Sequence, residues 1–190
     1  SSAKKDMCKK KNMVLVAFRT HYWNETTDAL ARKLYGQVAG LDFVVLADET
    51  HNTYDVGPFR KVSHTNQFSY LGLPDWTRGH DNILHYNGDY ALYALRHAEP
   101  NYDFYFLVEN DAIINIDIEK ILVNSARDGV DLIAMIDEVN SELHTEWHRN
   151  VKRWFNNTGR AFFPVVGVSA EMLDQLYQKR VNLMKEENAE

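Results

Sequence analysis

The fold is decided by residues 13–47, which read MVLVAFRTHYWNETTDALARKLYGQVAGLDFVVLA. The apolar, β-branched run at 13–18 has the pattern of a buried strand, and the run at 43–47 repeats that pattern. Between the two runs, capping residues at 24–27 precede apolar residues at helical spacing, and Gly40 can end the helix. A strand, a helix and a strand within about 35 residues predict a βαβ unit, whose two strands are parallel.

The alternation of strands and helices continues through the middle of the chain. A helix is predicted over 88–97, where apolar residues form a stripe and Pro100 stops the helix. The run at 104–108 is the third strand, and Asp117 then caps a helix that ends at Gly129. With a fourth strand at 132–136, the pattern predicts a single α/β domain with a mainly parallel central sheet flanked by helices.

Two segments do not follow this simple alternation. Residues 48–79 lose all periodicity, which predicts a long irregular connection of the kind that lines a site or covers a sheet edge. The run at 162–168 is a strand interrupted by Pro164, so we expect it at an edge or a bend of the sheet. Ser169 then caps a long amphipathic helix.

The charge of the chain limits its partners. Lysine and arginine number 21 and aspartate and glutamate 27, a net charge of -6. The first 13 residues hold five lysines and one aspartate, a net +4, so the other residues carry -10. An acidic body argues against nucleic acid as a partner, since a nucleic-acid binder needs a basic surface to neutralise phosphates.

The basic start of the chain is expected to be a tail. We predict that residues 1–12 are disordered and solvated, with at most peripheral contact with an anionic membrane, and that 13–190 form the domain. No apolar run reaches the roughly 20 residues that span a bilayer. The single cysteine, Cys8, lies in the tail and has no partner for an internal disulfide, and no secretory signal is visible, so a cytoplasmic location is expected.

The residues directly after the predicted strands are unusually polar. In open α/β sheets ligands bind outside the carboxyl ends of the strands, which makes these positions the first candidates for a site. Acidic side chains at three strand ends would repel one another unless a positive group lies among them. The strand ends carry Arg19, Thr20 and His21; Asp48, Glu49 and Thr50; Glu109, Asn110 and Asp111; and Asp137 and Glu138.

The most specific of these segments is FYFLVENDAI at 104–113. If the chain stays extended past the strand, alternation points Glu109 and Asp111 to the same side. Two such carboxylates are the hard oxygen ligands that Mg²⁺ or Mn²⁺ favours, with water and substrate phosphates as the other ligands. The alternative is a structural role, in which Asp111 caps a turn and Glu109 pairs with Arg19 or Arg96.

The stretch GDYALYALRHAEPNYDFYFLVENDAI at 88–113 resembles the core of GT-A-type glycosyltransferases, and is most similar to bacterial members with an E-x-D in place of the D-x-D triplet. In that family the triplet binds a divalent cation that holds the diphosphate of a nucleotide sugar. The likeness extends to MVLVAFRTHYW at 13–23, FVVLADET at 43–50 and FFPVVGVSAEML at 162–173. The chain stops where many members continue, and a C-terminal truncation is one interpretation of that difference.

The resemblance implies roles for particular residues. Glu109 and Asp111 would hold the Mn²⁺ or Mg²⁺ ion, and Asp48 would accept a hydrogen bond from the base or ribose. Asp81 would face the ribose or the sugar, and the nucleotide would be lined by Phe18, Arg19 and Thr20. Each role has a structural alternative: Arg19 neutralises Asp111, Asp48 caps a turn, and Asp81 caps the segment that follows it.

The implied activity is transfer of a sugar from a nucleotide-diphosphate donor to a saccharide or glycoconjugate acceptor. An inverting reaction needs a carboxylate base, for which the candidates are Asp137, Glu138 and Glu146, whereas a retaining reaction does not. The alternative is a non-catalytic nucleotide-sugar-binding or scaffold domain. Phosphoryl or nucleotidyl transfer ranks last, because AFRTHYW stands where a glycine-rich phosphate loop is expected.

Four of the histidines, at positions 51, 64, 80 and 85, are scattered in predicted loops. We expect most of them to be structural or at the surface, and one of them could join the cation site.

Overall fold

The computed structural model describes residues 13–74, 88–137 and 160–187, with the side chains of 136–137, 160–162 and 186–187 left undescribed. These residues form one six-stranded sheet in the order β3-β2-β1-β4-β6-β5. All neighbouring pairs are parallel except those of β6, which is antiparallel to both β4 and β5. The strands are β1 Val14–Thr20, β2 Asp42–Asp48, β3 Lys61–His64, β4 Phe104–Glu109, β5 Leu132–Asp137 and β6 Arg160–Ser169.

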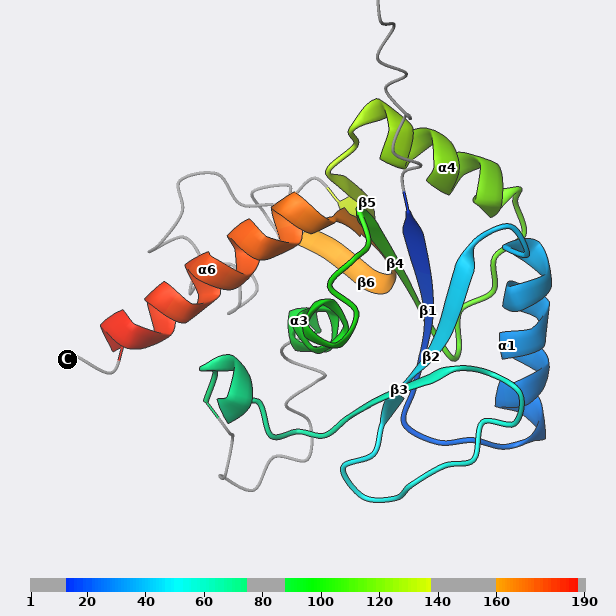
Figure 1. Cartoon of the computed structure of the whole chain (residues 1–190), viewed down its shortest axis with the longest axis horizontal. Coiled ribbons are helices and arrows are strands. Elements are labelled where there is room, and N and C mark those ends of the chain that lie inside the picture. Colours follow the sequence, from blue (N-terminus) through cyan, green and yellow to red (C-terminus); the bar gives the residue numbers. More distant parts are fainter. Residues whose placement is uncertain (1–12, 75–87, 138–159, 188–190) are drawn as a thin grey trace, which may run out of the picture.

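Helices cover both faces of the sheet, as Figure 1 shows. One face carries α1 (Glu25–Gln37) and α4 (Ile118–Asp128), and the other carries α3 (Asp89–Ala98) and α6 (Ala170–Glu187). A short 3-10 helix, η1, spans Ser69–Leu71. The α/β class, the mainly parallel sheet and the flanking helices are therefore confirmed.

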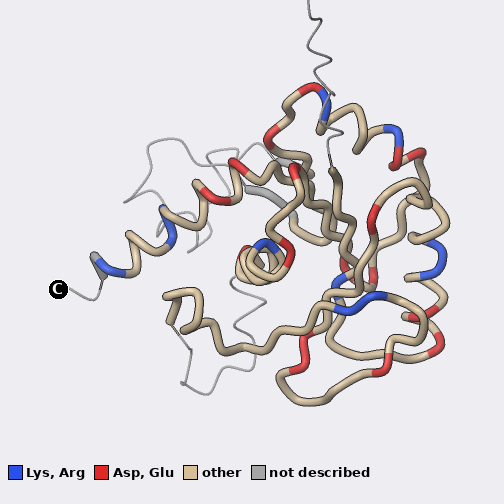
Figure 2. Tube along the Cα trace, in the orientation of Figure 1, with Lys and Arg blue, Asp and Glu red and all other residues tan. Residues whose placement is uncertain are grey.

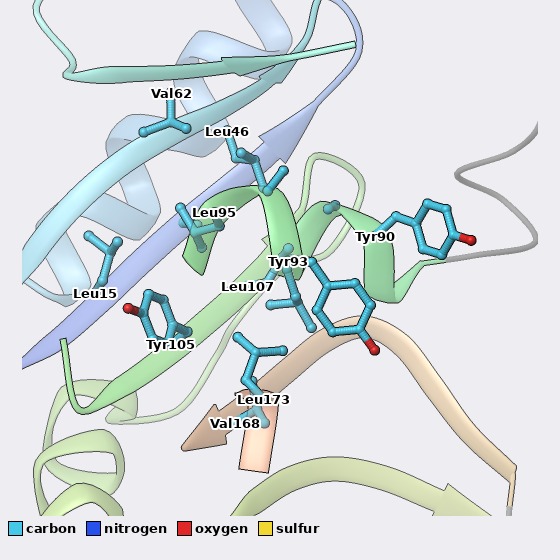
Figure 3. Packing of buried hydrophobic residues seen from close by; sticks show 14 of the residues in the cluster. Leu15, Leu46, Val62, Tyr90, Tyr93, Leu95, Tyr105, Leu107, Val168 and Leu173 are labelled. Atoms are coloured by element: carbon cyan, nitrogen blue, oxygen red, sulfur yellow. The ribbon is translucent and has the colours of Figure 1, made fainter. Parts of the chain in front are cut away.

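The central strands are apolar because both of their faces are covered. Side chains of β1, β2 and β4 alternate between two buried clusters, one under α3 and α6 and the other under α1 and α4. Figure 3 shows the first cluster, in which Leu15, Leu46 and Leu107 from the sheet meet Leu95 of α3 and Leu173 of α6. Burial on both faces explains why these strands read as continuous apolar runs rather than as alternating patterns.

The helix starts confirm the predicted caps. Asn24 and Thr27 form a reciprocal capping box at α1: the Thr27 amide donates to Oδ1 of Asn24 over 3.0 Å, and the Asn24 amide donates to Oγ1 of Thr27 over 2.8 Å. Ser169 accepts from the Met172 amide over 3.1 Å at the start of α6. Gly129, with φ of 72°, ends α4 in the left-handed conformation that glycine adopts without strain.

Two strand predictions differ from the structure, the second of them in only one of its two alternatives, the edge. The segment predicted to be irregular, 48–79, contains β3, a short edge strand parallel to β2. The strand with Pro164 lies between β4 and β5 rather than at an edge. The sheet tolerates this proline because the pairing of β5 and β6 shifts register between Ala134 and Met135, so that Pro164 falls at the irregularity.

Residues 1–12, predicted to be a tail, lie outside the described residues. Among the helices that the structure describes, none is long and apolar enough to cross a membrane. Figure 2 shows acidic and basic residues interspersed along α4 and α6, and both kinds together at the edge of the sheet where β1, β2 and β4 end.

Candidate functional site

The topology places a switch point between β1 and β4. Strand β1 pairs with β2 on one side and with β4 on the other, and all three strands are parallel. The helix after β1, α1, covers one face of the sheet, and the helix before β4, α3, covers the opposite face. Connections that leave in opposite directions open a crevice at the carboxyl ends of the strands, which is where open α/β sheets bind ligands.

Four polar side chains end the four neighbouring parallel strands on the same face of the sheet. Each polar residue comes two positions after an apolar residue that belongs to the cluster under α3. Because residues two positions apart in a strand point to the same face of the sheet, the polar side chains lie on the face that α3 covers. The apolar residues are Ala17, Leu46, Val62 and Leu107, and the polar residues, which we call the strand-end cluster, are Arg19, Asp48, His64 and Glu109.

An ion pair spans the switch point. Arg19 of β1 and Glu109 of β4 are register partners, and the Arg19 Nη1 donates to Oε1 of Glu109 over 2.9 Å. The two side chains are 12% and 31% exposed. The sequence predicted either Arg19 or Arg96 as the structural partner of Glu109, and the structure shows Arg19. Arg96 instead binds Asp174 through two nitrogens, at 3.0 and 2.9 Å.

Asp48 ends β2 and holds the loop that follows. Its Oδ1 accepts hydrogen bonds from the Thr50 amide over 3.0 Å and from the Thr50 hydroxyl over 2.5 Å. The same hydroxyl accepts from the Asn66 amide over 2.9 Å, which ties the loops after β2 and β3 together. One carboxylate oxygen of Asp48 therefore caps a turn, as the structural alternative predicted.

The neighbouring acid, Glu49, has a structural role. Burial alone would raise its pKa, but hydrogen bonds from Lys61, the Tyr54 amide and Ser63 outweigh burial and lower the pKa of this carboxyl group. The Lys61 Nζ lies 2.7 Å from Oε1 of Glu49, and the Tyr54 amide 2.9 Å from the same oxygen. These contacts hold Glu49 ionised and fully engaged.

His64 is the member of the strand-end cluster that the sequence did not single out. It is 5% exposed, and its ring lies 6.1 Å from that of Phe68. Burial lowers the pKa of the imidazole, and Arg19 acts in the same direction, whereas Asp48, Glu49 and the Thr65 carbonyl act to raise it. The ring is therefore neutral at neutral pH.

The E-x-D triplet does not stay extended. The Ala112 amide donates to the Glu109 carbonyl over 3.0 Å, which closes a turn over residues 109–112. Alternation along an extended strand therefore does not apply to Asp111, and it gives no ground for placing the two carboxylates on the same side. Asp111 is exposed, while Asn110 is 8% exposed and its Nδ2 finds no hydrogen-bond partner among the described residues.

Two predicted nucleotide contacts lie on the opposite face. Phe18 is 1% exposed and packs in the cluster under α1 and α4, with its ring 6.3 Å from Trp23. Its side chain belongs to the core, so a contact with a nucleotide would have to come through its backbone. Thr20 is 1% exposed, and its hydroxyl is bound within its own turn to the backbone of Tyr22.

Glu109 and Asp111 could hold a divalent cation only together with oxygen atoms of a bound ligand. Within the described residues, no group of three or more histidine, cysteine, aspartate or glutamate side chains could hold a metal ion. Glu109 and Asp111 are two residues apart at the same strand end, and one or two carboxylates with substrate phosphates are the usual set for Mg²⁺. The donor set thus suits a cation that arrives with a diphosphate.

The predicted catalytic bases are not placed by the structure. Glu138 and Glu146 lie outside the described residues, and of Asp137 only the backbone is described. Asp81, which was predicted to face the ribose or the sugar, also lies outside the described residues. Asp137 ends β5, which is separated from β4 by β6. Two strand spacings put it roughly 10 Å from the β4 ladder.

Two surface hollows lie away from the strand-end cluster. One of about 470 Å³ is lined by residues at the end of α1 and along α4, including Gln37 and Asn124. The other, of about 340 Å³, lies beside the start of β2 and is lined by Tyr35, Phe43 and Phe59 among others.

Comparison with known proteins gives likenesses of fold. Scans against protein-family models and against curated proteins found no match. Among solved structures, the chain is similar to a glycosyltransferase involved in the glycosylation of the major capsid of PBCV-1, with 8% identity and a TM-score of 0.43, over 88% of this chain and 67% of that chain. It is also similar to glucosyl-3-phosphoglycerate synthase of M. tuberculosis, with 13% identity and a TM-score of 0.46, over 84% of this chain and 58% of that chain.

A third similar structure is the UDP-glucose pyrophosphorylase of Leishmania major, with 9% identity and a TM-score of 0.45. The match covers 88% of this chain and 52% of that chain, so this chain spans about half of that enzyme. With identities of 13% or less and TM-scores below 0.5, these likenesses concern the fold alone.

Proposed function

We propose that this chain binds a nucleotide sugar at the carboxyl ends of β1, β2 and β4 and transfers the sugar to a saccharide or glycoconjugate acceptor, with a divalent cation as cofactor. The observation that carries the proposal is the Arg19–Glu109 pair across the switch point, with Asp48 at the end of β2 and Asp111 in the turn after Glu109. The Arg19 guanidinium lies among carboxylates at the strand-end crevice. Such a site suits a diphosphate that arrives with its own metal ion.

Arg19 has the geometry of a leaving-group stabiliser. Cleavage of the bond between the anomeric carbon and the diphosphate leaves negative charge on the leaving oxygen, while the sugar becomes oxocarbenium-like. A guanidinium that is already oriented can stabilise that charge without reorganising, and such preorganised donors contribute about 3 kcal/mol or more to transition-state stabilisation. Glu109 supplies the orientation, because its Oε1 holds the Arg19 Nη1 at 2.9 Å.

The remaining residues bind and position the donor. Glu109 and Asp111 would hold the Mn²⁺ or Mg²⁺ ion, which when bound neutralises the charge of the diphosphate. Asp48 would accept a hydrogen bond from the ribose or base through the carboxylate that also caps its turn. Asp81 is proposed for the ribose or sugar, and an inverting reaction would take its base from Asp137, Glu138 or Glu146.

Thermal unfolding tests the proposal. The protein should be scanned with UDP, GDP and CDP, each with and without Mn²⁺. A nucleotide at 100 times its dissociation constant stabilises the fold by about 2.7 kcal/mol, which corresponds to roughly 5–10 °C for a domain of this size. Asp111→Ala should lose the part that depends on Mn²⁺, whereas the control Glu171→Ala, at an exposed position in the first turn of α6, should keep it. No stabilisation by any nucleotide would overturn the proposal.

The second candidate is a binding domain without turnover. It is favoured by the engagement of Glu109 with Arg19, which occupies one oxygen of a carboxylate proposed for the cation. The two candidates differ in one assay: incubation with a nucleotide sugar that binds the protein, followed by measurement of released nucleoside diphosphate. Release above the level of Arg19→Met supports the transferase, and binding with no release supports the binding domain.

A further inference from the structure

His64 presents a buried nitrogen without a partner at the edge of the proposed site. The side chain is 5% exposed, and its Nε2 is buried without a hydrogen-bond partner among the described residues. The other ring nitrogen, Nδ1, lies 3.3 Å from the Thr65 carbonyl oxygen. A buried polar atom that is left unpaired costs about 1–3 kcal/mol, so its persistence calls for a physical reason.

The contact at Nδ1 assigns the chemistry of Nε2. A carbonyl oxygen can only accept a hydrogen bond, so the proton of the neutral ring belongs on Nδ1 and Nε2 carries a lone pair. Nε2 is therefore an acceptor. It can be satisfied by an N–H or O–H group and not by another carboxylate or phosphate oxygen.

The surroundings of His64 show where that donor would come from. His64 ends β3 and is the register partner of Asp48, which ends β2. The charged groups that act on the ring are Asp48, Glu49 and Arg19. Two of these are carboxylates, which cannot donate when ionised, and Arg19 is oriented toward Glu109 across the switch point. His64 thus lies at the same strand ends as the proposed diphosphate site, one strand beyond Asp48.

Building on the proposed function, we infer that His64 is a specificity-determining residue, whose Nε2 accepts a hydrogen bond from an N–H or O–H group of the donor's nucleoside. The phosphates lie across β1 and β4, and the nucleoside extends along the strand ends over β2 toward β3. Asp48 and His64 then present two acceptors side by side to the donor groups of the base or ribose.

Two substitutions separate this role from a structural one. His64→Phe removes the acceptor and keeps a ring beside Phe68. Because it also removes an unpaired polar atom, the free protein should be at least as stable as the wild type. Its affinity for the nucleotide should fall by about tenfold to a hundredfold, the loss expected when the nucleoside donor is left unpaired. His64→Gln restores an acceptor oxygen near the position of Nε2, and its affinity should stay within about fivefold of the wild type.

The measurement is calorimetric titration, in the presence of Mn²⁺, with whichever of UDP, GDP and CDP stabilises the wild type most. A base-N-methylated analogue and a 2′-deoxyribose analogue identify the group that His64 reads. The analogue that lacks the relevant donor should bind wild type and His64→Phe equally. A change in the ¹⁵N chemical shift of the His64 Nε2 on nucleotide binding is the spectroscopic counterpart.

The outcomes distinguish this inference from the function on which it rests. No binding of any nucleotide to the wild type overturns both. Binding to the wild type with equal affinity in His64→Phe overturns the role of His64 alone. Equal losses in His64→Phe and His64→Gln, or a His64→Phe protein that is less stable without nucleotide, would show that the ring is structural.

Discussion

Acidification should destabilise the protein through His64. Burial and Arg19 lower the pKa of this imidazole, and they outweigh Asp48, Glu49 and the Thr65 carbonyl, which act to raise it. A histidine of the unfolded chain titrates near 6.5. Because the unfolded state takes up the proton more readily than the folded state, the titration of His64 leaves the free energy of unfolding unchanged above about pH 6.5 and lowers it as the pH falls below that value.

The magnitude follows from the linkage between proton binding and folding. If the ring stays neutral in the folded state, the cost is about 0.8 kcal/mol at pH 6 and about 2 kcal/mol at pH 5, relative to neutral pH. The slope approaches about 1.4 kcal/mol per pH unit and levels off once the folded state also binds the proton. These figures are the largest that the linkage allows, because burial and Arg19 lower the pKa of the ring and the cost stops growing where the folded state binds the proton.

Urea unfolding at pH 7.5, 6 and 5 measures this cost. His64→Phe lacks the titrating group, so its stability relative to the wild type should increase between pH 7.5 and pH 5, by at most about 2 kcal/mol. Titrations of all other groups cancel in that difference. The matched control is His51→Gln, which changes an exposed histidine away from the strand-end cluster. If His64→Phe runs parallel to the wild type, the imidazole is not a buried neutral group and the reasoning fails.

Three further predictions concern packing and charge. Gly167→Ala should destabilise the fold by about 1–3 kcal/mol in urea unfolding, because the added Cβ would lie 2.8 Å from Cε1 of Phe104; an unchanged midpoint would show that the ring moves aside freely. A double-mutant cycle of Arg19→Met and Glu109→Gln should give a coupling free energy of about 1 kcal/mol by the same method, and a value near zero would mean that solvent screens the pair. Asp111→Asn should keep the melting temperature of the free protein within about 1 °C of the wild type, because the side chain is exposed. The same substitution should remove the Mn²⁺ dependence of nucleotide binding, and a retained dependence would mean that the cation binds elsewhere.

The long apolar runs made the main strands predictable. Strands β1, β2 and β4 are buried on both faces, and such strands read as uninterrupted apolar segments. Strand β3 was missed because it has four residues at a sheet edge, KVSH, with Val62 as its only apolar side chain. Strand β6 was predicted at an edge or a bend because of Pro164. It is an interior strand, and a register shift at the proline lets the sheet accept it there.

The same reasons limited the prediction of the site. Arg19, Asp48 and Glu109 were found because they end recognisable strands. His64 was not assigned to the site, because β3 was not recognised as a strand. Within a strand, His64 points to the same face as the buried Val62 two positions earlier, and this spacing would have placed it with the other strand-end residues. The turn after Glu109 was predicted only in the structural alternative, because the leading interpretation extended the pattern of β4 into Asn110 and Asp111, two residue types that favour turns.

A crystal structure grown with Mn²⁺ and the nucleoside diphosphate that most stabilises the protein tests the central claim most directly. Anomalous scattering would locate the metal ion and difference density the diphosphate. We predict the ion at the carboxylates of Glu109 and Asp111, with the diphosphate against Arg19 at the carboxyl ends of β1 and β4. A nucleotide bound away from these strand ends, or an ion held without these two carboxylates, would contradict the proposed site.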